Sequence, residues 1–463
     1  MGRVEGKVAI VTGGASGLGA ADARVLAAEG AAVILTDIDV TKGEALAEEI
    51  GAEFFEHDVS QEEAWVRLME QTVDRHGGLD VLVNNAGIAI VADIERTTNH
   101  DVKAIEYYLR ECLQAHPSLT ALVPFIHFGC TSEDINNLAY GLMLQSSREV
   151  LCDHLLSITQ SLHSLSQEHS SLAMLAHTHG QPASPTTLGK ELFNVVARLR
   201  SQLSSLKECP IPGKFNGAVG NFNAHVAAFP NHDWPTICQD FVESLKLQYN
   251  PLTTQIEPHD QLAALMHHLI RTNNILIDYA RDTWHYISMQ YFTQLKKSSE
   301  VGSSTMPHKI NPNDFENAEG NLGMANAIAQ HLANKLPISR LQRDLSDSTV
   351  QRNIGVVMGH SLLAYQSLSK GLAKIEVNKQ KIQNDVAQRW ELLAEPIQTV
   401  LRANGDADAY EKLKTLTRGE NINQVTLHEF IQSLDIRDED KQRLLALTPG
   451  NYIGLATQLC EGH

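Results

Sequence analysis

A short stretch rich in hydroxyl groups carries the clearest chemistry in this sequence. Gly302–Pro312 has the sequence GSSTMPHKINP. Its glycine and three hydroxyl residues favour a loop, and its two prolines restrict the backbone of the second half. Lys309 and Asn311 add a cation and an amide donor just after the hydroxyl groups of Ser303 and Ser304, an arrangement that suits an anionic intermediate. The competing interpretation is a plain surface turn.

A histidine could supply acid–base chemistry, because its side chain titrates near neutral pH. Most of the 21 histidines are expected to be structural or solvated. His179 differs in its surroundings, since Gly180 and Pro182 beside it indicate an irregular helix start that faces a cleft. His177 is interpreted as structural.

Two arginines are candidates for binding an anion. Arg343 and Arg352 carry guanidinium groups, whose forked geometry suits phosphate and carboxylate. Surface salt bridges to Asp344 or Asp347 explain these arginines equally well from the residues alone.

A second candidate site lies near the N-terminus. After an apolar strand, Thr12–Gly19 has the sequence TGGASGLG and opens a helix. Glycines at 13, 17 and 19 permit a tight turn and close approach of a pyrophosphate to the helix N-terminus. Asp37 comes at the end of the second strand, where a carboxylate would accept hydrogen bonds from an adenosine ribose. The alternative is a turn whose glycines serve packing only.

The elements that must position these groups follow two different sequence patterns. Up to about Val91, short apolar strands alternate with amphipathic helices, which predicts a parallel α/β sheet. From Glu95 onward, long helical stretches such as Val102–Ala115 and Ile135–Gln167 predict an all-α architecture. The chain is therefore predicted to be mainly α, with a partial α/β segment in front.

Bulk properties exclude several classes of function. The net charge of -18 and the lack of a basic run argue against a nucleic-acid surface. The six cysteines are scattered without a CxxC pair, so neither zinc nor a disulfide framework is predicted, and no metal site is expected. No run of about 18 apolar residues is present, so we expect neither a membrane span nor export, and a cytoplasmic location fits.

The helical part resembles the adenylosuccinate lyase family. Its landmarks are ERTTNHDVKAIEYYL, FIHFGCTSEDINN, THGQPASPTTLGKEL, NGAVGNFNAH, TTQIEPHD, GSSTMPHKINPNDFENAEGNL and QRDLSDSTVQRN, in that order. The GSSxMPxKxN pattern belongs to the wider fumarase and aspartase superfamily, whereas the other motifs indicate the purine-nucleotide branch. The resemblance implies a long helical bundle and elimination of fumarate from adenylosuccinate and from the succinylated aminoimidazole carboxamide ribotide.

The resemblance also implies roles for individual residues. Ser303 would be the base that creates a doubly charged aci-carboxylate, with Ser304, Lys309 and Asn311 holding the substrate's carboxylates. His179 would be the acid that protonates the departing amine. Further nucleotide contacts are implied at Asn99, His100, Asp101, Thr131, Ser132, Gln255, Asn317, Arg343, Ser348, Thr349 and Arg352.

Part of that implied substrate-binding set has a structural alternative. Thr131 or Ser132 could cap a helix that has Glu133 or Asp134 in its first turn. Both interpretations can hold together, because a helix N-terminus is itself an anion site.

The N-terminal segment resembles the short-chain dehydrogenase/reductase family. The TGxxxGxG pattern matches at Thr12–Gly19, and the later motifs Asp58–Val59 and Asn84–Gly87 match as well. The catalytic Ser and YxxxK pair of that family lie on later elements, and nothing after Gly87 reads as those elements, so hydride transfer is not expected. The resemblance would assign cofactor contacts to Gly13, Ser16, Gly17, Leu18, Gly19, Asp37, Asp58, Val59 and Asn85.

These motifs support two hypotheses of function. The first is a fumarate-releasing lyase that needs no cofactor, with domains at 1–93, 94–355 and 356–463. By the resemblance it would form homotetramers whose active sites draw on three subunits, although the replaced N-terminal region, which lacks the family's Gly-Arg-Tyr motif, could impair it. The alternative is a module or oxidoreductase that binds NAD, preferred over NADP because Asp37 would repel a 2′-phosphate.

Overall fold

The computed structural model describes residues 2, 4–59, 61–83, 98–295, 306, 309–417 and 422–461. Its contacts group the chain into two units, Met1–Phe128 and Gly129–His463. The predicted domain boundary near residue 93 lies outside the described residues.

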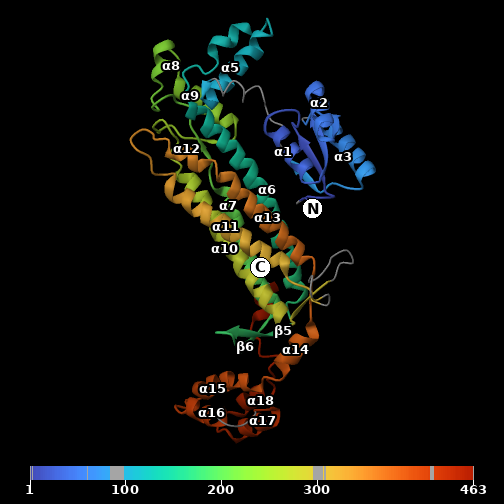
Figure 1. Ribbon diagram of the computed structural model, residues 1–463. Helices are drawn as coiled ribbons and strands as arrows, with labels where there is room; N and C mark the ends of the chain where they lie inside the picture. The colour runs from blue at the N-terminus through green and yellow to red at the C-terminus, as the bar shows by residue number, and fades with distance from the viewer. Residues whose placement is uncertain are drawn as a thin grey trace. The chain divides into compact units, whose positions relative to one another are not determined.

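The first unit contains a four-stranded parallel sheet with the strand order β3 (Glu53–Glu56), β2 (Ala32–Asp37), β1 (Val8–Thr12) and β4 (Val81–Val83). Its helices α1, α2 and α3 are labelled in Figure 1. Every residue of β1 is buried, as expected for a parallel strand covered on both faces. Alternate residues face opposite sides: Val11 and Leu35 pack with α1 and α2, whereas Ile10 and Ile34 pack with Leu68 of α3. The helices between these strands are α1 (Gly17–Ala28), α2 (Val40–Ile50) and α3 (Glu62–His76).

The described part of the first unit also contains two helical elements after the sheet. The amphipathic helix α5 (Asp101–Gln114) is followed by the 3-10 helix η1 (Thr120–Phe125). The side chain of His100 caps α5 by accepting a hydrogen bond from the backbone N–H of Lys103 at 3.3 Å.

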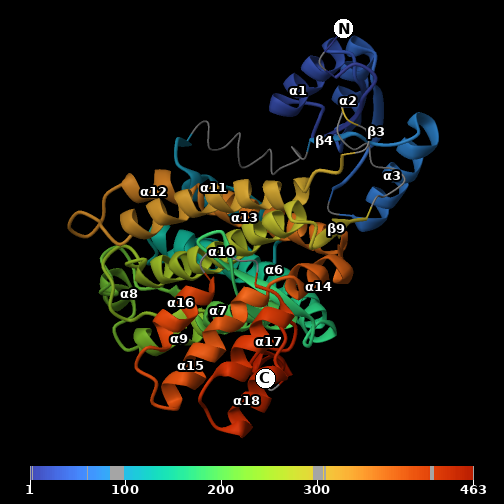
Figure 2. The same cartoon turned by 90° about the horizontal axis from the view of Figure 1, so that it is seen from below.

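Long helices that lie side by side build most of the second unit (Figures 1 and 2). They share one apolar core that includes Leu155, Leu199, Leu276 and Leu322, none of them more than 1% exposed. The predicted all-α architecture is therefore confirmed. The five helices are α6 (Ser132–Glu168), α7 (Leu188–Glu208), α10 (Asp260–Ser288), α11 (Asn313–Lys335) and α13 (Ile354–Leu372).

Short strand pairs and small helices lie around the long helices. Two strand pairs are antiparallel, β5 (Ala173–Thr178) with β6 (Gln181–Thr187) and β9 (Phe292–Gln294) with β10 (Ile375–Val377), and one is parallel, β7 (Pro212–Gly213) with β8 (Gln248–Tyr249). The smaller helices of this part are α8 (Asn223–Ala228), α9 (Trp234–Ser244) and α12 (Ser346–Gln351).

The C-terminal helices have a second, smaller core, which includes Leu393, Ile397, Leu427 and Ile431. Among the described helices none is long and apolar enough to cross a membrane. The elements around this smaller core are η2 (Trp390–Leu393), α15 (Ala394–Ala403), α16 (Ala409–Thr417), α17 (Gln424–Ser433) and α18 (Asp438–Leu445). The other two C-terminal helices, α14 (Lys379–Ala387) and α19 (Ala456–Glu461), contribute Ile382 and Cys460 to the core of the long helices.

Candidate functional site

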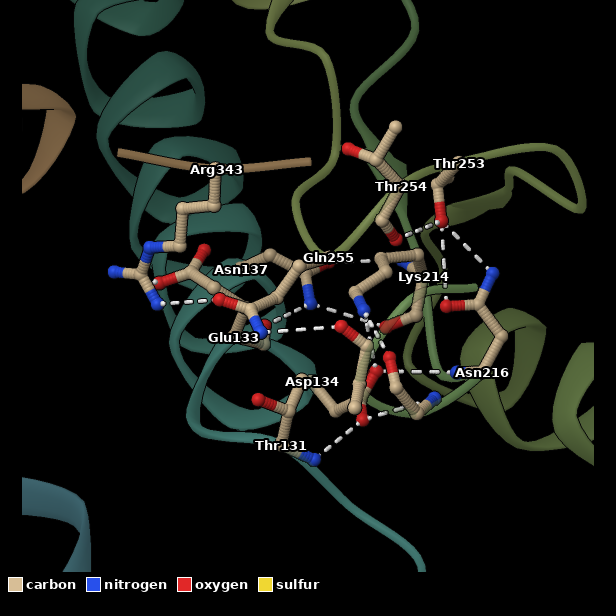
Figure 3. Close-up of polar contacts among 12 residues, drawn as sticks. Thr131, Glu133, Asp134, Asn137, Lys214, Asn216, Thr253, Thr254, Gln255 and Arg343 are labelled. Atoms are coloured by element: carbon tan, nitrogen blue, oxygen red, sulfur yellow. Dashed lines mark hydrogen bonds and ion pairs between the residues drawn. The ribbon is translucent and has the colours of Figure 1, made fainter. Parts of the chain in front are cut away.

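A network of polar side chains surrounds the N-terminus of α6 (Figure 3). Thr131 caps the helix in a capping box with Asp134, as predicted from the sequence. The Asp134 carboxylate accepts hydrogen bonds from the backbone N–H groups of Thr131 at 2.8 Å and of Asn216 and Gly217 at 3.1 Å. One carboxylate therefore joins the start of α6 to the segment after β7.

Lys214 completes this network from the other side. Its Nζ lies 2.9 Å from Asp134 Oδ1 and donates to the carbonyl oxygen of Gly217 at 3.0 Å. Both charged side chains are 0% exposed. Burial lowers the pKa of Lys214, and the facing Asp134 opposes that shift.

Close backbone packing brings these segments together. A Cβ at Gly129 would lie 2.6 Å from His225 Nε2, and a Cβ at Gly220 would lie 2.3 Å from the carbonyl oxygen of Thr253. Both glycines also have positive φ, of 67° and 79°. The glycines of FGCTSED and NGAVGN therefore serve backbone conformation and close approach.

Arg343 lies beside this network and contacts two carboxylates. Its Nη2 is 3.1 Å from Glu133 Oε1, its Nη1 donates to Gln255 Oε1 at 3.5 Å, and its Nε is 3.9 Å from Asp347 Oδ2. Burial raises the pKa of Glu133, while Arg343 lowers it and Asp347 raises it further. The sequence left two alternatives for Arg343, which were binding of an anion and a surface salt bridge to Asp344 or Asp347. An ion pair with Asp347 is present, but its side chains are largely buried rather than at the surface.

A buried histidine links the same end of the molecule to α10. His259, 5% exposed, has its Nε2 3.1 Å from Gln351 Nε2, and its backbone N–H donates to Glu257 Oε2 at 2.8 Å. Burial is the main cause that lowers its pKa to about 4. His259 is therefore neutral in the folded protein at neutral pH.

This shifted pKa predicts a loss of stability in acid. The unfolded chain takes up a proton at His259 below its ordinary pKa of 6.5, whereas the folded chain does so only near pH 4. Stability therefore falls as the pH is lowered through that window, by up to about 3 kcal/mol. In His259→Asn, which tolerates the φ of 64° at this position, the melting temperature should fall less between pH 7.5 and 5. An equal fall in both proteins would contradict this assignment.

The opposite end of the long helices carries a second group of candidates. His179 and Gly180, with φ of 54° and 72°, form the two-residue turn between β5 and β6. The predicted irregular helix start at His179 is therefore wrong, because two consecutive positive φ angles close a β-hairpin, and α7 begins only at Leu188. The side chain of His179 is exposed.

Lys309 and Asn311 belong to this second end. They precede α11, and the carbonyl oxygen of Ile310 between them accepts a hydrogen bond from Gln294 of β9 at 3.0 Å. Because α6 has 37 residues, about 1.5 Å apart along the helix axis, roughly 55 Å of helix separates Thr131 from the hairpin end. Within one chain, the two groups cannot reach the same small substrate.

The remaining candidates are distributed over both units. Ser348, Thr349 and Arg352 lie on or next to α12, near Arg343, and Asn317 on α11 accepts a hydrogen bond from Ser367 at 2.7 Å. Ser132 is the first residue of α6. Asn99, His100 and Asp101 lie in the first unit at the start of α5. Ser303, Ser304 and Asn85 lie outside the described residues.

The N-terminal candidates lie around the turn between β1 and α1 and at the ends of β2 and β3. Gly17 opens α1 with φ of 56° and open space around it, and Ser16 and Leu18 beside it are exposed. Each oxygen of the Asp37 carboxylate accepts one backbone N–H, from Ala15 and from Asp39, both at 3.0 Å. Gly13 precedes this helix, Gly19 is buried within it, and Asp58 and Val59 are exposed after β3.

The sequence interpretation missed the residues that organise the α6 end. Asn137 donates to the carbonyl oxygen of Lys214 at 3.0 Å and accepts from its backbone N–H at 2.8 Å, while the side chain of Asn216 donates to Thr253 at 2.9 Å. A lysine between a proline-glycine pair and NGAVGN is the only sign of this network in the sequence. The described residues contain no group of three or more His, Cys, Asp or Glu side chains that could hold a metal ion.

Three family models match this chain. A model described as "Lyase" matches residues 61–328, and "Adenylosuccinate lyase C-terminal" matches residues 339–453. A "short chain dehydrogenase" model matches residues 7–109 and so overlaps the lyase match.

Curated relatives and a solved structure agree with the lyase matches. Adenylosuccinate lyase of Legionella pneumophila (strain Corby) is 55% identical over 80% of this chain and 82% of its own length. The enzymes of that name from Haemophilus influenzae and Escherichia coli (strain K12) are 49% and 51% identical over 91% and 84% of this chain, and over 95% and 86% of their own lengths. The crystal structure of 3-carboxy-cis,cis-muconate lactonizing enzyme from Pseudomonas putida has the same fold, with a TM-score of 0.65 and 20% identity, covering 82% of this chain and 84% of its own.

Proposed function

This chain belongs to the adenylosuccinate lyase family, and from that premise we propose that it cleaves adenylosuccinate to AMP and fumarate. The succinylated aminoimidazole carboxamide ribotide of purine synthesis is the second proposed substrate. The observation that carries the proposal is identity of 49–55% to enzymes of that name over most of the chain. The chain is a C–N lyase. We also propose a cytoplasmic location, which the six free cysteines suit.

The chemistry assigns a role to each group of residues. Ser303 removes the proton next to a succinyl carboxylate, and Lys309 and Asn311 stabilise the resulting negative charge. His179 donates a proton to the purine amine as the C–N bond breaks. Arg343 and Thr131, at the other end of the bundle, hold the anionic and polar parts of the nucleotide.

An absorbance assay tests this proposal. Adenylosuccinate added to the purified chain should lose its ultraviolet absorbance as AMP and fumarate form in equal amounts. A folded protein that releases no fumarate at high enzyme concentration would contradict the proposed activity.

We also propose a homotetramer with active sites shared between subunits. The proposal is supported by the positions of His179 and Arg343 at opposite ends of the long helices, which only a second chain can bring together. Exposed apolar side chains on α6, among them Met143 and Val150 at 54% and 46% exposure, suit a helix-to-helix contact. The mass in solution should be four times 51.0 kDa, and a monomer with full activity would contradict shared sites.

A second candidate function concerns the N-terminal segment. We propose that it is a fused half of a short-chain dehydrogenase domain that binds NAD. The support is the parallel strand order β3-β2-β1-β4 together with the glycine turn before α1. The N-terminus of α1 at Gly17 would hold the pyrophosphate, and the remaining lone pairs of Asp37 would accept from a ribose hydroxyl.

NAD supplies hydride transfer in complete dehydrogenases, but the sequence after Gly87 does not read as the elements that carry the catalytic Ser and YxxxK pair, so binding alone is proposed. Titration with NADH, followed by fluorescence, should give a saturable signal that Gly17→Asp removes by placing a carboxylate against the pyrophosphate. A wild-type titration without saturation would contradict it.

A further inference from the structure

The Lys214–Asp134 ion pair is fully buried, and a gain in stability alone does not explain two charges in such a position. Both side chains are 0% exposed. Burying two charges carries a desolvation penalty that their attraction often fails to offset, and apolar residues of similar size are commonly as stable in such positions. An ion pair retained at full burial therefore indicates a role in fixing geometry.

The pair fixes the backbone of two segments at once. Asp134 Oδ1 contacts Lys214 Nζ and the N–H of Asn216, and its Oδ2 accepts from Thr131 and Gly217. These four donors occupy the four acceptor positions of one carboxylate. Lys214 in turn holds the carbonyl oxygen of Gly217 at 3.0 Å.

The segment that follows Lys214 also contacts the loop that carries Thr253 and Gln255. The Asn216 side chain donates to Thr253 Oγ1 at 2.9 Å, and Gln255 donates to the carbonyl oxygen of Ala218 at 3.1 Å (Figure 3). Residues 214–218 therefore join the start of α6, with Thr131, to the loop that carries Gln255.

We propose that Lys214 and Asp134 are positioning residues that hold Thr131 and Gln255 at the spacing that the nucleotide requires. This inference rests on the proposed lyase function, in which Thr131 and Gln255 contact the substrate. Neither Lys214 nor Asp134 takes part in proton transfer.

Replacing Lys214→Met tests the proposal. KM for adenylosuccinate should rise about tenfold or more, because the geometry that binds the nucleotide is lost. The value of kcat should change less than about threefold, because the proton-transfer groups stay in place. A merely structural role gives the opposite split: a smaller folded fraction lowers the apparent kcat and leaves KM unchanged. Leu155→Ala, in the apolar core along α6, is the matched control. Measured below the melting temperature of this variant, its kcat and KM should both equal those of the wild type.

Amide hydrogen exchange supplies a readout that does not depend on activity. In Lys214→Met, peptides that cover residues 129–134 and 253–257 should exchange faster, whereas the middle of α6 should not. Asn216→Ala keeps the ion pair and should accelerate exchange only around 253–257, with a smaller rise in KM.

Each result decides the matter. If Lys214→Met folds with wild-type KM and exchange, the proposal is overturned. If that variant does not fold, Asn216→Ala decides, and its unchanged KM and exchange overturn the proposal as well. A wild-type chain that does not cleave adenylosuccinate contradicts the lyase function alone, since the exchange measurements still test the positioning.

Discussion

Glutamine in place of His179 is expected to lower kcat for fumarate release by about 10² to 10⁴, the usual contribution of a general acid. The purine amine departs poorly without a proton, and glutamine can donate a hydrogen bond but cannot transfer its proton. KM should change little, because ground-state contacts through the amide remain. Steady-state kinetics on adenylosuccinate measure both constants.

The hairpin itself provides a matched control. His177 is exposed on β5, two residues before His179, and contacts Tyr291 with ring centroids 6.4 Å apart. His177→Gln should keep kcat near that of the wild type. Equal losses in the two variants would show that the hairpin tolerates neither change and would remove the assignment of His179 as the acid.

The separation of His179 from Arg343 gives this prediction a second part. Arg343→Gln should also be nearly inactive, yet oligomers mixed from the two variants should regain activity. Under random mixing, roughly a quarter of the shared sites combine an intact His179 from one chain with an intact Arg343 from another. Mixed oligomers that stay inactive would contradict shared sites.

Alanine in place of Ser303 is expected to reduce kcat by about 10² to 10⁴, because it removes the proposed base while leaving the anion-binding groups in place. Lys309 and Asn311 would still bind the carboxylates, so a substrate complex should form without turnover. Binding measured by calorimetry and fumarate release measured in the same preparation separate the two effects.

A serine outside the motif serves as the control for Ser303. Ser298→Ala, five residues earlier in the same stretch, should retain activity. Wild-type turnover in Ser303→Ala would require another base, whereas a loss in both variants would indicate damage to this segment as a whole.

Local patterns in the sequence determined most of the fold. The all-buried β1 and the alternating faces of the parallel sheet result from runs of apolar residues, and the long helices result from their periodicity. The cap formed by Thr131 and Asp134 was also predictable, because the hydroxyl and the carboxylate are only three residues apart. The turn at His179 was not, because the competition between a hairpin and a helix start depends on strand pairing with β6.

The sequence by itself determined the family and the reaction class, since motifs in order along the chain carry that information, and it supplied the residues that we propose for the chemistry. Only the tertiary structure decided that Lys214 and Asp134 meet at full burial, because they are 80 residues apart and no local pattern encodes their contact. It also decided that His179 and Arg343 lie at opposite ends of the long helices. Rigid helices keep such groups apart, so the shared site that we propose would depend on how chains assemble rather than on the order of residues.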